Sequence, residues 1–251
     1  MEKIIKKTIG KAIETDMVKN MGKDISNSEI EVSVIFPTYN EAENIIPLIQ
    51  RTQQALVNHS KEIIVVDDGS KDKTYLEAKK SKAIVLKHIV NMGKGVAMKT
   101  GIEYAIKNKA DTIVLIDADG QHNPKEIPKL LKKLNKSDIV FGTRKMPENS
   151  PRVFRLGNWG LNNIFRVLFG AKIDDTQNGF RAFKSKIYPK IKWHSHGYFV
   201  ETEMIINTLK NDIAFTEIPV ETFYHDAYKG TSVLVGMGFF IKMLEVKIGW
   251  I

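Results

Sequence analysis

The sequence has no cysteine among its 251 residues. Disulfide bonds, a thiol nucleophile and cysteine-ligated zinc are therefore excluded. It also lacks an uninterrupted apolar run of the roughly 20 residues that a transmembrane helix needs. Lysines interrupt the N-terminal segment, so it does not contain the apolar core of a signal peptide. From these absences we expect a cytoplasmic protein.

Acidic residues are fewer than basic ones, at 29 against 38, and the formal net charge is +9. A basic surface favours anionic partners such as acidic lipids or phosphorylated substrates. No nucleic-acid-binding module is recognisable and aromatic residues are not interleaved with the basic ones, so nucleic acid is not an expected partner. Apolar residues make up 43% of the chain, which is enough for a packed core in one large or two small domains.

The chain from Glu31 onward alternates strand-like and helix-like segments. Strands are predicted at 32–36, 63–67, 83–89, 112–117 and 138–142, and helices at 41–57, 72–80, 94–108 and 124–134. Asn40 is expected to cap the first of these helices. Because the strand-like runs are apolar throughout, they predict strands covered on both faces, and hence an α/β protein with a mostly parallel sheet.

Beyond Pro147 the pattern is less regular, with helices predicted at 152–169 and 198–209 and a strand at 214–220. Both ends of the chain are amphipathic or apolar. Residues 1–24 carry an apolar residue at every fourth position among lysines, which is typical of a membrane-surface helix or of a helix packed on its own domain. The tail from Val235 is too short and too charged to span a bilayer, and it either lies on a membrane or packs as a last helix.

Polar clusters follow five of the predicted strands. Asp117 and Asp119 come directly after an apolar run, and side chains two apart in an extended segment point the same way. Two carboxylates, with Gln121 two positions further on, suit Mg²⁺ or Mn²⁺ bound together with substrate phosphates, whereas the alternative is an acidic turn without a ligand. Ligands of parallel sheets bind at the carboxyl ends of strands, so the clusters predict a metal-dependent enzyme with a phosphate-bearing substrate. The other four clusters are 37–41, 67–70, 91–95 and 142–144.

These clusters, in this order, resemble the motifs of the family 2 glycosyltransferases, in particular the dolichyl-phosphate mannose synthase-like (polyprenyl-phosphate hexosyltransferase) branch. The motifs are Val34-Ile-Phe-Pro-Thr-Tyr-Asn-Glu41, Val65-Val-Asp-Asp-Gly-Ser70, Asn91-Met-Gly-Lys-Gly95, Asp117-Ala-Asp-Gly-Gln-His122, Gly142-Thr-Arg144 and Asp175-Thr-Gln-Asn-Gly-Phe-Arg181. The resemblance implies a GT-A fold, with a mostly parallel Rossmann-like sheet flanked by helices. It also implies a catalytic domain (29–235) with a nucleotide-binding half (29–146) and an acceptor half (147–235). The residue pattern outside it predicts an N-terminal helix and linker (1–28) and an apolar tail (236–251).

The resemblance also implies roles for individual residues of this sequence. The expected nucleotide-binding residues are Pro37, Tyr39, Glu41, Val66, Asp68, Asp117, Ala118 and Lys229. The expected metal-site residues are Asp117, Asp119 and Gln121. The expected catalytic residues are Asp119, Arg144 and Asp175. Arg155 is expected to contact the acceptor phosphate, with Arg152 as its rival.

The implied reaction is inverting transfer of a hexose from a UDP- or GDP-linked sugar to dolichyl or polyprenyl phosphate, by a peripheral protein at the inner face of the membrane. A phosphomonoester with a second pKa of about 6 is mostly ionised near neutral pH, so it can attack without a strong base. Asp175 would then orient the acceptor or act as a weak base. Gln177-Asn178 stands where mannose synthases have Thr-Ser, which leaves mannose, glucose and N-acetylglucosamine open. The alternatives are a family 2 enzyme with a saccharide or protein acceptor, or a non-catalytic module that binds nucleotide sugars or anionic lipids.

Overall fold

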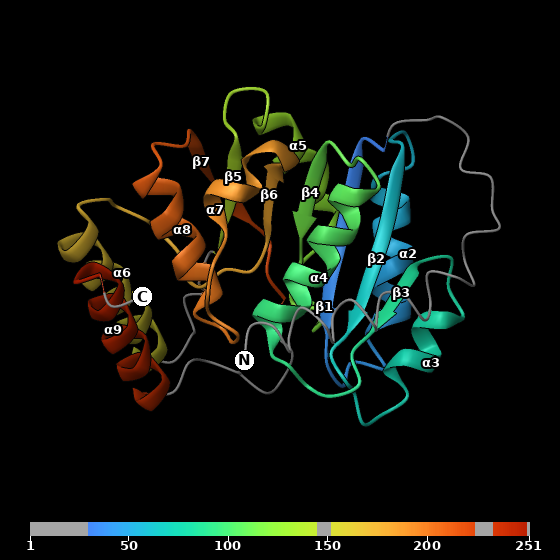
Figure 1. Cartoon of the computed structure of the whole chain (residues 1–251), viewed down its shortest axis with the longest axis horizontal. Helices are drawn as coiled ribbons and strands as arrows, with labels where there is room; N and C mark the ends of the chain where they lie inside the picture. Colours follow the sequence, from blue (N-terminus) through green and yellow to red (C-terminus); the bar gives the residue numbers. More distant parts are fainter. Residues whose placement is uncertain (1–29, 145–151, 224–232, 250–251) are drawn as a thin grey trace. The chain divides into compact units, whose positions relative to one another are not determined.

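The structure is a computed structural model that describes residues 30–144, 152–223 and 233–249. The chain divides into two compact units, the first ending at Gly120 and the second beginning at Gln121. Each unit has its own strands and its own flanking helices (Figure 1). The predicted division into a nucleotide-binding and an acceptor half at 146/147 concerns function, and it stays a prediction.

The first unit is built on four parallel strands in the order β3-β2-β1-β4. Apolar side chains fill both faces of its central strands, so that Val34, Ile35 and Phe36 are fully buried. The mostly parallel α/β architecture is thereby confirmed for this part of the chain. The strands are β1 (Val32–Thr38), β2 (Lys61–Asp67), β3 (Ile84–Lys87) and β4 (Thr112–Leu115), and the helices are α2 (Ile45–Ala55), α3 (Thr74–Lys79) and α4 (Lys94–Lys107).

Helix α4 packs closely on the sheet of the first unit. A Cβ atom at Gly101 would lie 2.5 Å from the side chain of Ile35 in β1, so only glycine permits this approach. The prediction for the start of α2 was wrong. Asn40 does not cap that helix but has a left-handed backbone (φ 56°), and its side chain accepts a hydrogen bond from the backbone N–H of Lys71. The helix begins four residues later than predicted because the intervening segment is bonded to the loop after β2 instead.

The second unit has a central strand, β5 (Ile139–Arg144), with β6 (Arg181–Lys184) antiparallel on one side and β7 (Phe215–Val220) parallel on the other. Its core is aromatic. The buried rings include Phe141, Phe165, Phe180, Phe183, Trp193 and Phe199. The helices are η1 (Pro124–Glu126), α5 (Ile127–Lys133), α6 (Arg152–Phe169), η2 (Ser185–Ile187), α7 (Tyr188–Ile191), α8 (Val200–Lys210) and α9 (Val233–Lys247).

Helix α6 has the predicted bounds, and the apolar tail forms a last helix, α9, that packs beside it (Figure 1). Phe239, Met243 and Val246 are the buried residues on the inner side of α9. The predicted helix at residues 1–24 lies outside the described residues. Within the described residues, no helix combines the length and the apolarity that crossing a bilayer requires.

Candidate functional site

Four polar clusters meet at the carboxyl ends of the parallel strands of the first unit. The end of β1 is joined to the end of β2 by a hydrogen bond of 2.8 Å from the Asp68 N–H to the carbonyl of Thr38. The N–H of Asn40 donates to the hydroxyl of Ser70 at 2.9 Å. The loops after the two strands are therefore fixed to each other, as expected for parallel strands that end at the same edge.

Asp68 connects this edge to the segment that precedes α4. Its buried carboxylate accepts hydrogen bonds from the N–H groups of Met92 at 2.9 Å and Gly93 at 2.8 Å, and it lies 2.7 Å from Nδ1 of His88. Burial raises the pKa of the Asp68 carboxyl, but the hydrogen bonds from His88 and the two N–H groups outweigh it and the pKa lies below its ordinary value. The ionised Asp68 side chain thus links the end of β2 to the segment before α4. Its predicted contact with the nucleobase stays a prediction.

The turn after Asp68 requires a glycine. Gly69 has a φ of +71°, in the left-handed region, and a Cβ atom there would lie 2.5 Å from the carbonyl carbon of Val90. The loop after β2 therefore lies directly on the backbone that leads into Asn91 and Gly93.

Lys94 links the last two clusters of the first unit. It is the first residue of α4, and its Nζ lies 2.6 Å from Oδ1 of Asp117, which follows β4. Asp117 and Asp119 are both half-buried and flank the buried Ala118. All four strand ends are thus connected through direct contacts, and the two carboxylates lie at the edge where the sequence predicts them.

The chemistry of these carboxylates fits a divalent cation. Mg²⁺ and Mn²⁺ prefer hard oxygen ligands and keep positions for water and substrate phosphates. Among the described residues, no group of three or more His, Cys, Asp or Glu side chains is arranged to hold a metal without further ligands. Asp117 and Asp119 would therefore supply part of a coordination shell that phosphate oxygens complete.

The remaining predicted nucleotide-binding residues of this unit differ in exposure. Pro37 pairs with Val66 across β1 and β2, and the Val66 side chain is buried against α4. Any contact of Val66 with a ligand would therefore be made through its backbone. Tyr39 is 39% exposed, and the half-buried Glu41 accepts a hydrogen bond of 2.7 Å from the side chain of Asn44.

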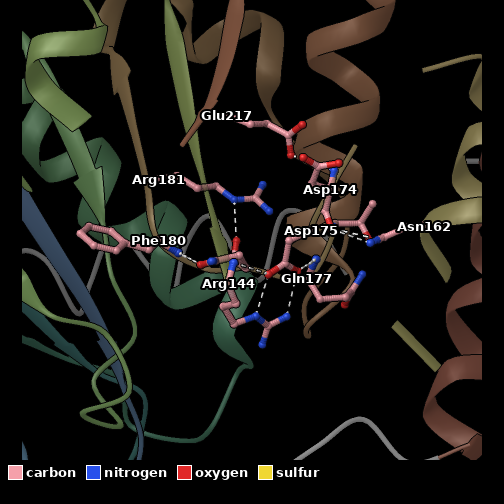
Figure 2. Close-up of polar contacts among 10 residues, drawn as sticks. Arg144, Asn162, Asp174, Asp175, Gln177, Phe180, Arg181 and Glu217 are labelled. Atoms are coloured by element: carbon pink, nitrogen blue, oxygen red, sulfur yellow. Dashed lines mark hydrogen bonds and ion pairs between the residues drawn. The ribbon is translucent and has the colours of Figure 1, made fainter. Parts of the chain in front are cut away.

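In the second unit, two of the predicted catalytic residues contact each other directly. Arg144, at the end of β5, donates from Nε to Oδ2 of Asp175 at 2.7 Å and from Nη2 to Oδ1 at 2.9 Å (Figure 2). The backbone N–H groups of Arg144 and Gln177 donate to the same carboxylate. The Asp175 side chain is 2% exposed, whereas that of Arg144 is 23% exposed and reaches the surface.

This environment makes Asp175 a weak base. Burial raises the pKa of its carboxyl, but the charge and hydrogen bonds of Arg144 and the N–H of Gln177 outweigh burial and hold the pKa below its ordinary value. A carboxylate that already accepts four hydrogen bonds gains little from taking a proton. The contacts are those of a residue that fixes the orientation of Arg144.

Asn162 of α6 holds the loop that carries Asp175. Its Nδ2 donates to the carbonyl of Asp174 at 2.6 Å, and its Oδ1 accepts from the hydroxyl of Thr176 at 3.0 Å (Figure 2). The backbone on either side of Asp175 is therefore fixed to a helix. Arg181 adds a second anchor, since it is buried and donates to the carbonyls of Asn178 at 2.9 Å and Glu201 at 2.7 Å.

Glu217 in β7 lies beside the same loop (Figure 2). Burial raises the pKa of its carboxyl, and the negative charges of Asp174 and Asp175 raise it further, although the N–H of Asp174 donates to it at 3.0 Å. The carboxylates of Asp174, Asp175 and Glu217 therefore lie close together, and Arg144 forms an ion pair with that of Asp175.

The other predicted site residues of the second unit are less defined. Gln121 is half-buried, and its backbone carbonyl accepts a hydrogen bond of 2.7 Å from the N–H of Phe223. Arg152 and Arg155 both lie in the first turn of α6, and their side chains are outside the described part. Lys229 lies outside the described residues.

Sequence reasoning did not identify His88 or Asn162. Neither lies within a motif, and each acts through one side chain that meets a distant segment. No periodicity or spacing in the sequence indicates such contacts. The sequence does indicate Lys94 as a possible neighbour of a phosphate, because it stands in a glycine-flanked turn before a helix.

Comparison with known proteins agrees with this architecture. The sequence model of the family described as "Glycosyl transferase family 2" matches residues 33–200. The chain is 33% identical over 246 residues to a UDP-N-acetylglucosamine–dolichyl-phosphate N-acetylglucosaminyltransferase of Methanococcus voltae, covering 87% of this chain and 96% of that protein. It is 32% identical over 185 residues to a dolichol-phosphate mannosyltransferase of Pyrococcus furiosus, covering 70% and 53%. Glucosyl-3-phosphoglycerate synthase of Mycobacterium tuberculosis, solved with UDP, has a TM-score of 0.67 at 24% identity, covering 88% of this chain and 80% of that one, which confirms the GT-A fold.

Proposed function

Since the chain belongs to glycosyl transferase family 2, we propose that it transfers a hexose from a UDP- or GDP-linked sugar to dolichyl or another polyprenyl phosphate. The observation that carries the proposal is the contact of Lys94 with Asp117 at an edge where four strand ends meet. An ammonium group and two carboxylates placed together suit a diphosphate bound with a divalent cation. The named relatives that act on lipid phosphates support the choice of acceptor.

The proposed chemistry is stabilisation of a leaving nucleoside diphosphate. Asp117 and Asp119, with Gln121 as predicted, would hold a Mg²⁺ or Mn²⁺ ion whose charge offsets that of the diphosphate. Lys94 lies against the carboxylate of Asp117 and would add a positive charge beside the diphosphate. Arg144 and Lys229 are proposed to act on the same diphosphate, as the family resemblance implies.

The acceptor needs no strong base in this proposal. A phosphomonoester with a second pKa of about 6 already carries a nucleophilic oxygen anion at neutral pH. The lowered pKa of Asp175 supports this view, because a saturated carboxylate is a poor proton acceptor. We therefore assign Asp175 the role of positioning Arg144, and Arg155 or Arg152 that of binding the acceptor phosphate. In-line attack by that oxygen inverts the anomeric carbon.

The test is an assay with the purified chain, Mn²⁺ or Mg²⁺, dolichyl phosphate and a panel of UDP- and GDP-hexoses. We expect one donor to label a product that partitions into organic solvent, and we expect EDTA to abolish the labelling. Asp119→Asn should lower turnover by about a hundredfold or more. Asp111→Asn is the matched control, because this exposed aspartate lies just before β4. Turnover that EDTA leaves unchanged would contradict the metal role.

The same assay separates the alternatives. Label in a soluble glycan or a protein would indicate a family 2 enzyme with a different acceptor. Donor binding without turnover, unchanged by Asp119→Asn, would indicate a binding module. A lipid product would also agree with the proposed place of action, which is the inner face of the membrane with the chain bound as a peripheral protein.

A further inference from the structure

Helix α9 has apolar residues on both of its sides. Phe239, Met243 and Val246 face the interior of the second unit. The opposite side carries an outward stripe with the spacing of successive helical turns. The stripe consists of Met237 (57% exposed), Ile241 (54% exposed), the half-buried Leu244 and Ile248 (57% exposed). Ile248 follows the last helical residue but continues the turn, because its N–H donates to the carbonyl of Leu244 at 2.9 Å.

Charged side chains flank this outward stripe. By helical geometry the exposed Lys247 lies on one flank, and the half-buried Glu245, with the exposed Lys242 beyond it, lies on the other. The ammonium group of Lys242 lies 5.7 Å from the ring centre of Phe199, and that of Lys247 lies 5.9 Å from the ring centre of Phe169. Long basic side chains beside an apolar strip are the arrangement of helices that lie in a membrane interface.

The neighbouring helix also exposes large apolar side chains. Helix α6 packs beside α9 (Figure 1) and exposes Trp159 (64%) and Val167 (83%). Tryptophan is enriched where proteins meet the boundary between lipid and water. Several large apolar side chains on one helix pair are more than the scattered exposed residues that need no explanation.

We propose that the outward stripe of α9, with Trp159 and Val167 of α6, docks on the surface of an anionic lipid bilayer. The apolar side chains would enter the interface while Lys242 and Lys247 meet lipid phosphates. A second copy of the chain is a poorer occupant. A twofold contact brings the same patch together from both sides, and the two lysines of this helix outnumber Glu245, its single acid, so positive charge would remain uncompensated.

The proposed function does not specify this docking surface, and testing the surface needs no sugar donor. The wild-type chain is mixed with vesicles of phosphatidylcholine, with or without phosphatidylglycerol, and co-flotation is measured. We expect binding to the anionic vesicles only. The double variant Ile241→Glu/Ile248→Glu should weaken this binding by about tenfold or more, because it places charges in the apolar strip. The Lys242→Gln/Lys247→Gln variant should also weaken it, and added salt should weaken wild-type binding.

Val57→Glu is the matched control, since Val57 is an apolar residue of the first unit with 72% exposure. It should bind vesicles as the wild type does, and circular dichroism should show that every variant is folded. Transfer to a short, water-soluble polyprenyl phosphate should survive Ile241→Glu/Ile248→Glu, which separates a failure of docking from a failure of the proposed chemistry. Equal flotation of this variant and the wild type would overturn the proposal. So would a stable wild-type dimer that the variant abolishes while neither protein binds vesicles.

Discussion

The guanidinium of Arg144 and the carboxylate of Asp175 form a bidentate ion pair, with two N–H···O bonds of 2.7 and 2.9 Å. Planar, two-pronged pairs of this kind fix the direction of the arginine side chain as well as its position. One partner is buried and the other reaches the surface. The pair therefore presents a cation at the end of β5 in a defined orientation.

If Asp175 positions Arg144, the two residues act as a unit. We expect Arg144→Lys and Asp175→Asn each to lower kcat/KM, and the double variant to lose much less than the sum. The coupling in a double-mutant cycle should be about 1–3 kcal/mol. The ion pair of Lys184 with Asp138, at 3.0 Å and partly exposed, is the control. In the same double-mutant cycle on kcat/KM, its coupling energy should be less than about 1 kcal/mol. Additive losses for Arg144 and Asp175 would contradict the positioning role.

Asp68 should make stability depend on pH in the acid range. Its pKa in the folded protein lies below the unfolded value of about 3.9, so the ionised group stabilises the fold above that value. This contribution is lost as the pH falls through the folded-state pKa. Asp68→Asn should lower the free energy of unfolding at neutral pH by about 1–3 kcal/mol, because two backbone N–H groups lose a charged acceptor. Urea unfolding should show this difference shrinking below about pH 4. If the difference in the free energy of unfolding between wild type and Asp68→Asn stayed constant with pH, the stabilising role of the ionised Asp68 would be excluded.

Lys94 should matter for turnover more than for metal binding. Lys94→Met removes a positive charge next to Asp117, so we expect kcat to fall by about tenfold or more. The Mn²⁺ concentration for half-maximal activity should not rise, whereas Asp117→Asn should raise it. Lys107→Met, at the exposed far end of α4, is the control and should behave as the wild type. A higher Mn²⁺ requirement in Lys94→Met would mean that the lysine helps to hold the ion site together.

Gly69→Ala should damage the fold more than an ordinary left-handed glycine would. The alanine Cβ would lie 2.5 Å from the backbone of Val90, in addition to the strain of a φ of +71°. We expect a loss of about 3 kcal/mol in the free energy of unfolding, from strain and overpacking together. Gly170→Ala is the matched control, because it has a φ of +72° with open space around it and should cost about 1 kcal/mol. Equal losses at the two positions would show that the loop after β2 moves aside.

The elements of the sheet could be predicted because their patterns are local. Apolar strands such as Val32–Thr38 and the amphipathic helix Arg152–Phe169 carry their own periodicity. The position of Asp117 and Asp119 also followed from local order, since parallel strands end at one edge. Element ends were less accurate, and β4 stops at Leu115 rather than Asp117. Helix ends depend on which distant groups satisfy the backbone, as Asn40 illustrates by bonding to Lys71 instead of capping α2.

Long-range single contacts could not be predicted. Asn162 contacts residues 12 and 14 positions away, and His88 meets Asp68 across 20 residues. These bonds form only once the sheet has brought the segments together. The contacts of Asp68 with His88 and of Asp175 with Arg144 add structural roles that the sequence did not indicate, and the predicted ligand contacts of both residues stay predictions.

The hydrogen bonds of the Asp68 carboxylate to Met92 and Gly93 have a consequence for redesign. The side chain joins the loop after β2 to the segment before α4 during folding, so the shape of that edge is set before any small molecule arrives. An engineer who tests the predicted nucleotide-binding residues should therefore leave this carboxylate intact and vary the partly exposed Tyr39 first. A library that randomises both would discard useful Tyr39 replacements along with the misfolded clones.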